Sequence, residues 1–167
     1  MKLNILLIST GSLLLSSAAF GQASATASAT PAAAAIYKGL TLAKTANLDF
    51  GSVITGTSSG SLVLAPSGGV TTTGVTQVTG STPVAAAFTA TGHAGSGINI
   101  TLPASPITMS DGASHTMTVS AFTSNPSGSG TLTGGTLAFN VGATLNVGAN
   151  QAEGSYSGTF DVTVVYN

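Results

Sequence analysis

The amino-acid sequence predicts an all-β fold, an antiparallel sandwich of short strands. Beyond residue 32, short runs of Val, Ile, Thr and Phe recur between clusters of Gly, Ser, Pro and Asn, a pattern typical of strands separated by turns. The same part of the chain lacks the i, i+3, i+4, i+7 spacing of apolar residues that marks an amphipathic helix. Many short, closely spaced strands favour a sandwich with Greek-key-like connections.

The expected strands follow one another along the chain, each bounded by turn residues. Stretches rich in Gly, Ser and Pro, such as residues 56–60 and 125–130, mark the turns. Thr is frequent because its branched side chain suits a pleated sheet while its hydroxyl hydrates the outer face. Strands are expected at residues 36–44, 48–54, 61–64, 75–78, 84–91, 98–102, 115–123, 136–141, 144–147 and 156–166.

The chain of 167 residues carries little charge, with 3 Lys+Arg and 4 Asp+Glu. So few basic residues cannot neutralise the phosphates that a nucleic-acid-binding surface contacts. The absence of Cys excludes disulfides, Cys-ligated zinc and thiol catalysis. Weak charge repulsion between molecules also favours their association. The length suits one domain.

The first residues have the pattern of a secretory signal peptide. Lys2 precedes an apolar stretch at residues 5–20, and small residues follow it. Cleavage after Gly21 or after Ala23 would satisfy the preference for small residues, and this choice stays open. We therefore expect a signal peptide at residues 1–21 and an exported protein.

Residues 22–35 form an N-terminal extension in which small side chains alternate. Alanine occupies the odd-numbered positions 23, 25, 27 and 29, and Ser or Thr occupies the even-numbered positions that alternate with them. Alanine methyls bury too little area to start a sheet alone, but such a segment could lie in a groove that another molecule provides. A flexible Ala/Ser/Thr linker is the alternative interpretation. Residues 36–167 remain as the β-sandwich domain.

The C-terminal residues alternate between two faces over 156–166. A period of two predicts a half-buried strand. On alternation alone, it could equally be the final strand of a closed sandwich.

Three features of this segment carry a resemblance to a known family. Gly154 is the fourteenth residue from the end, Tyr166 is penultimate, and apolar residues alternate between them. This arrangement resembles the C-terminal motif of chaperone–usher pilus subunits. The body, in stretches such as residues 45–51 and 144–151, also resembles a family of secreted domains of unknown function found alongside pilus chaperones. Many pilins join early strands by a disulfide, and this chain departs from them in having no Cys.

The resemblance implies an immunoglobulin-like antiparallel sandwich that is incomplete and is finished by a donor strand. A periplasmic chaperone would fill the groove first, and at an outer-membrane usher the extension of another copy or a related pilin would replace it, giving a cell-surface pilus. The implied donor residues are Ala23, Ala25, Ala27, Ala29, Ala33 and Ala35. The implied chaperone- and donor-facing residues of the final strand are Gly154, Tyr156, Phe160, Val162, Val164 and Tyr166.

The side chains that a catalytic or metal site would need are few and scattered. The sequence contains neither a Gly-x-Ser-x-Gly elbow nor a His-x-x-x-His pair. We therefore expect no enzymatic activity, no cofactor and no metal. The ionisable residues that such a site could use are His93, His115, Asp49, Asp111, Glu153, Asp161, Lys38 and Lys44.

Two functions stay open from the sequence. The first is a structural pilus subunit that polymerises by donor-strand exchange. The alternative is a monomeric secreted or cell-surface β-sandwich binding module, with its site in loops such as 92–97 or 124–130. An open groove beside residues 156–166 would favour the first, and an extension folded into its own sheet would favour the second.

Overall fold

The computed structural model describes residues 31–167. The chain divides into two compact units, Met1–Ala35 and Ile36–Asn167, and the second unit, here called the domain, is considered by itself. The expected signal peptide lies outside the described residues, as does most of the extension, including Ala23, Ala25, Ala27 and Ala29.

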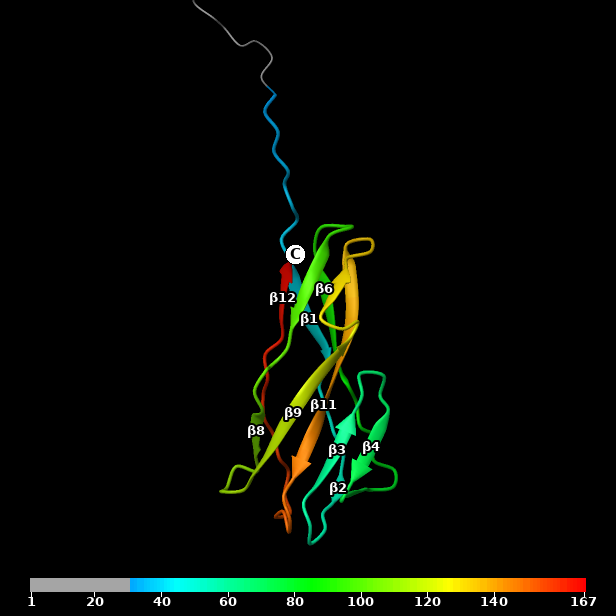
Figure 1. Cartoon of the computed structure of the whole chain (residues 1–167), viewed down its shortest axis with the longest axis vertical. Coiled ribbons are helices and arrows are strands. Elements are labelled where there is room, and N and C mark those ends of the chain that lie inside the picture. Colours follow the sequence, from blue (N-terminus) through cyan, green and yellow to red (C-terminus); the bar gives the residue numbers. More distant parts are fainter. Residues whose placement is uncertain (1–30) are drawn as a thin grey trace, which may run out of the picture. The chain divides into compact units, whose positions relative to one another are not determined.

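Every regular element of the domain is a β-strand, which confirms the predicted all-β class (Figure 1). All the strand pairs are antiparallel. The strands are β1 (Thr41–Ala46), β2 (Val53–Ile54), β3 (Gly60–Leu64), β4 (Val70–Thr73), β5 (Thr76–Gln77), β6 (Ala86–Thr91), β7 (Gly97–Thr101), β8 (Ile107–Ser110), β9 (Thr116–Asn125), β10 (Ser129–Thr131), β11 (Thr136–Val147) and β12 (Thr163–Tyr166).

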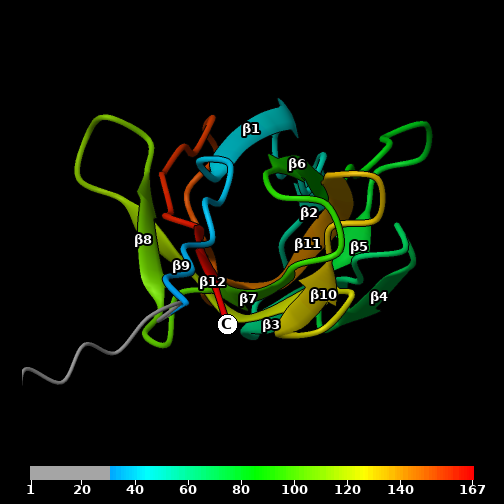
Figure 2. The same cartoon turned by 90° about the horizontal axis from the view of Figure 1, so that it is seen from above.

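The long strand β11 organises a seven-stranded sheet. One edge of β11 pairs with β6 along its first half and with β3 along its second half, while the other edge pairs with β9. Strands β1, β4 and β8 lie outside β6, β3 and β9. A second sheet has the order β10-β7-β12, and β2 pairs with β5. Figure 2 shows the sheets curled around a common interior, which agrees with the predicted sandwich.

A glycine allows β11 to change partners along one edge. At Gly142, a Cβ atom would collide with the carbonyl oxygen of Leu64 and with the backbone of Ala65. The end of β3 therefore lies so close to β11 that only glycine, which has no Cβ atom, fits at this position. Because of this approach, one strand spans both halves of the domain.

The core consists of two clusters, one in each half of the domain. Partly buried Leu48 and Phe122 pack against both clusters and join them. The first cluster contains Phe50, Leu62, Leu64, Val75, Val119, Ala143, Leu145 and Val147. The second contains Ala86, Phe88, Ala90, Ile98, Ile100, Leu132, Phe139 and Val141.

A bulge in β9 lets this strand contribute to both clusters. Ala121 and Phe122 lie opposite the single residue Ala143 of β11, and Ala121 has a φ of 51°. Because of the extra residue, the inward-facing side chains fall on odd-numbered positions up to Val119 and on even-numbered positions from Phe122. Without it, Phe122 would face solvent.

Several predicted strand boundaries were wrong. Residues 136–141 and 144–147 form the single strand β11, because Gly142 continues the ladder with β9. Strands β4, β8 and β10 were not predicted, since their sequences combine few large apolar residues with Gly, Ser or Pro nearby. Of the predicted strand at 156–166, only Thr163–Tyr166 forms a ladder with β7.

Replacing Ala121 by glycine should stabilise the domain. A non-glycine residue in the left-handed region costs about 1–2 kcal/mol, while the added glycine flexibility costs about 0.5–1 kcal/mol. The Ala121 side chain is exposed, so no packing is lost. Urea unfolding should show a gain of up to about 1 kcal/mol for Ala121→Gly. The matched change Ala138→Gly, at an exposed position of β11, should lower stability instead, and a loss in both variants would contradict the strain at Ala121.

Candidate functional site

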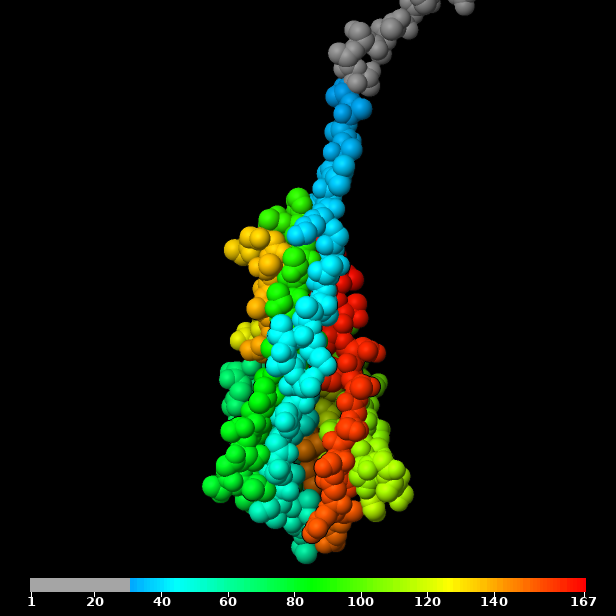
Figure 3. Space-filling view, turned by 180° about the vertical axis from the view of Figure 1, so that it is seen from behind, coloured from blue at the N-terminus to red at the C-terminus, as the bar shows by residue number. Residues whose placement is uncertain are grey.

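A groove of about 1050 Å³ separates the first and last segments of the domain. One wall is formed by residues 44–55, which run from β1 into β2, and the other by residues 151–160, which lead into β12. In Figure 3 these two segments, coloured cyan and orange-red, run side by side with a hollow between them. Residues distant in sequence therefore build one elongated site.

The base of the groove consists of core residues. Phe88 from one core cluster and Leu145 from the other line it, together with Ala86. The cross-strand partners Met109 and Met117 also contribute, and both are half-buried. The groove thus reaches the apolar interior of the domain.

The first and last strands of the domain each use only one hydrogen-bonding edge. Strand β1 pairs with β6, and β12 pairs with β7. No ladder joins β1 to β12 within residues 31–167. Each strand therefore presents an edge whose N–H and C=O groups lack a strand partner, and such edges are templates for strand addition.

The last segment is held to the domain mainly by its side chains. Ser157 exchanges two backbone hydrogen bonds of 2.9 Å with Ser110. Among the described residues, no backbone hydrogen bond reaches residues 158–162. Phe160 instead packs on Phe122, with ring centroids 5.0 Å apart. The backbone of this stretch remains free to accept another strand.

The predicted residues of the final strand fall into two groups. Phe160, Val162, Val164 and Tyr166 are partly buried against one core cluster, with exposed residues between them. Gly154 and Tyr156 lie in the loop region at one end of the groove instead. In the extension, Ala33 and Ala35 are exposed and belong to no strand, while the other predicted donor residues lie outside the described part.

Tyr166 closes the gap between the first and last segments at one end. Its hydroxyl accepts a hydrogen bond from the His93 N–H (2.7 Å) and donates one to the Lys38 carbonyl (2.6 Å). Its ring lies edge-on to Tyr37 at 5.7 Å. At Gly92, a Cβ atom would collide with the Tyr166 hydroxyl. We call this arrangement the tyrosine clasp.

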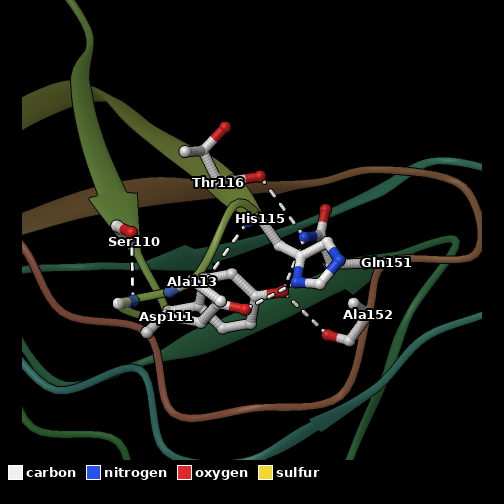
Figure 4. A network of polar contacts seen from close by, with 9 residues as sticks. Ser110, Asp111, Ala113, His115, Thr116, Gln151 and Ala152 are labelled. Atoms are coloured by element: carbon white, nitrogen blue, oxygen red, sulfur yellow. Dashed lines mark hydrogen bonds and ion pairs between the residues drawn. The ribbon is translucent and has the colours of Figure 1, made fainter.

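A polar network orders the opposite end of the groove (Figure 4). Gln151 Nε2 donates to the Tyr156 hydroxyl (2.8 Å), which donates to the Ala152 carbonyl (2.8 Å). Beside them, His115 Nδ1 lies 2.6 Å from Asp111 Oδ2. This hydrogen bond, with one from the Ala113 N–H, holds the pKa of Asp111 below its ordinary value. These contacts fix loops and bring no nucleophile together with a base.

The described residues form no grouping suited to a metal. His93 belongs to the tyrosine clasp and His115 to the network at the other end. Across residues 31–167, no cluster of three His, Cys, Asp or Glu could hold an ion. In the same range, no helix is long and apolar enough to cross a membrane.

One wall and the base of the groove could not be predicted from the sequence. Residues 44–55 and the Met109–Met117 pair were not predicted to share a site. No local pattern marks them, because the topology alone brings them beside residues 151–160.

A family model for a domain of unknown function, DUF4402, matches residues 40–166. Neither the curated proteins nor the solved structures contain a match to the chain. The matched range includes both walls of the groove.

Removing the Tyr166 hydroxyl should loosen the tyrosine clasp locally. Tyr166→Phe deletes two hydrogen bonds, each with a net contribution of about 1 kcal/mol. Hydrogen exchange at the His93 amide should accelerate. Tyr156→Phe, which also removes two hydrogen bonds but at the other end, should leave that amide unchanged. Equal protection of His93 in Tyr166→Phe and the unchanged protein would contradict the role of the clasp.

Proposed function

The chain belongs to the family of the DUF4402 domain of unknown function, and we propose that it is a structural subunit of a cell-surface pilus. Each copy receives the N-terminal extension of another copy in its groove, by donor-strand exchange. A periplasmic chaperone occupies the groove before assembly, and an outer-membrane usher exchanges the strands. This proposal includes export, through the signal peptide expected at residues 1–21.

The observation that carries the proposal is the groove between the segment that continues from the open edge of β1 and the segment 151–160, of which residues 158–162 make no backbone hydrogen bond, with core residues at its base. An extended segment placed there would find hydrogen-bonding partners along the walls and an apolar surface below. Strand addition uses this combination, because backbone hydrogen bonds provide affinity and alternate side chains provide register.

The length and composition of the extension fit this groove. Residues 23–35, extended at about 3.3 Å per residue, would span more than the ten-residue wall at 151–160. Each ladder hydrogen bond contributes about 1 kcal/mol net. Alanine methyls add little, but the groove supplies larger groups of its own, such as Phe88 and Phe160. Small donor side chains suit a base that is already lined by large ones.

The same features support a need for a chaperone. A groove with an apolar base beside an open strand edge exposes the free subunit to edge-to-edge aggregation. The low charge of the chain provides little repulsion against it. A chaperone strand in the groove would protect the subunit until another copy replaces it.

Placing a charge on the groove-facing side of the extension should block polymerisation. Ala27→Asp would bury a carboxylate without a partner, at a cost of several kcal/mol. Polymers that resist detergent without heating should disappear, while export of the subunit continues. Thr26→Asp is the matched control, because alternate side chains of a strand point to opposite faces. Unchanged polymer in Ala27→Asp would contradict the assignment of the donor segment.

Polymerisation should protect the methionines of the groove from oxidation. Met109 and Met117 line its base, and an inserted strand would shield both thioethers from peroxide. Mass spectrometry should find slower sulfoxide formation in polymer than in the Ala27→Asp subunit. A control peptide without methionine reports the recovery of each sample. Equal rates, together with a thermally robust monomer, would favour the alternative of a monomeric binding module.

A further inference from the structure

The domain has two opposite ends, each built from segments distant in sequence (Figure 1). The clasp end contains residues 36–40, loop 92–97 and the end of β12, joined by Tyr166. The loop end contains residues 54–59, 111–115 and 148–155. There, the Asn150 N–H donates to the Gly56 carbonyl at 3.0 Å, and Gln151 donates to the Thr116 carbonyl at 3.3 Å.

The few charged side chains of the domain are distributed unequally between these ends. Lys38 lies at the clasp end, next to His93. Glu153 lies at the loop end, and its neighbour Gly154 lies beside Asp111. The remaining charges, on Lys44, Asp49 and Asp161, belong to the segments between the ends. The two ends therefore differ in charge, with Lys38 at one and Asp111 and Glu153 at the other.

The same two ends carry the most exposed large apolar side chains of the domain. Ile36 and Tyr37, at the clasp end, are 90% and 59% exposed. Ile54, at the loop end, is 58% exposed and lines the groove. Exposed apolar groups with a charged neighbour are typical of contact surfaces.

We infer that consecutive copies dock end to end, with the clasp end of one copy on the loop end of the next. In this arrangement Lys38 faces Glu153 of the neighbouring copy, and Ile36 lies against its Ile54. The inference depends on the proposed function, because it places the extension of the first copy in the groove of the second.

The donor's residues 36–38 are joined directly to its extension, so the position of the extension in the groove decides at which end of the acceptor they lie. The clasp joins the two walls at one end through the Tyr166–Lys38 hydrogen bond. At the loop end the segments beyond the walls are joined by the Asn150–Gly56 hydrogen bond. The acceptor's own residues 36–38 occupy only the clasp end, which leaves the loop end, near Ile54 and Glu153, for those of the donor. When residues 23–35 of the donor occupy the groove, its residues 36–38 follow directly and lie at this end. Opposite charges and two apolar side chains then meet there.

A charge-swap experiment tests this contact. The unchanged protein, Lys38→Glu, Glu153→Lys and the double variant are purified as full exported chains, and their assembly rates are measured by light scattering. Each single variant should assemble about two- to fivefold more slowly at low salt, and the double variant should recover. At 1 M salt, where charges are screened within about 3 Å, the differences should disappear.

Neither substitution is expected to unfold the domain, so a change in assembly rate reports on the contact between copies. Lys38 contributes only its carbonyl to the clasp, and Glu153 is exposed. Ala138→Lys is the control for added positive charge, since Ala138 is exposed on β11 and does not line the groove, and this variant should assemble at the unchanged rate. If the unchanged protein assembles and all variants match it, the end-to-end contact is wrong while the proposed function stands. If the unchanged protein forms no polymer, both are wrong.

Discussion

The structure depends on a constraint at its first and last strands, each of which has a hydrogen-bonded neighbour on one side only. Strand β1 completes one sheet and β12 completes another, and no ladder within residues 31–167 connects them. Side chains alone must cover the interior between them. They do so near Tyr166, but toward the loop end the covering fails and core residues line an open groove.

The rest of the domain keeps this groove in shape. Strand β11 spans both core clusters because Gly142 admits the end of β3. The bulge at Ala121 turns Phe122 inward, where it meets Phe160 of the last segment. The first wall is tied to β6 through β1, and the last wall to β9 through the Phe160–Phe122 contact.

The sequence predicts the fold class well because alternation and turn residues report directly on strands. It also predicts which side chains of the last segment face inward, from Phe160 to Tyr166. It fails to predict the ladder there, since alternation records burial and carries no information on backbone partners. Strand β10 was missed for a related reason: Gly130 resembles a turn residue, yet Ser129–Thr131 pairs with β7 through the backbone. The groove arises because the topology brings distant segments together, so no local sequence pattern predicts it.

The position of the tyrosine clasp has a mechanical consequence. Tension applied to the chain before Ile36 enters the domain beside the Tyr166–Lys38 hydrogen bond and then runs along β1. The ladder between β1 and β6 lies parallel to this pull, so its bonds would bear the load together and could not open one after another. A domain attached in this way resists stretching in shear.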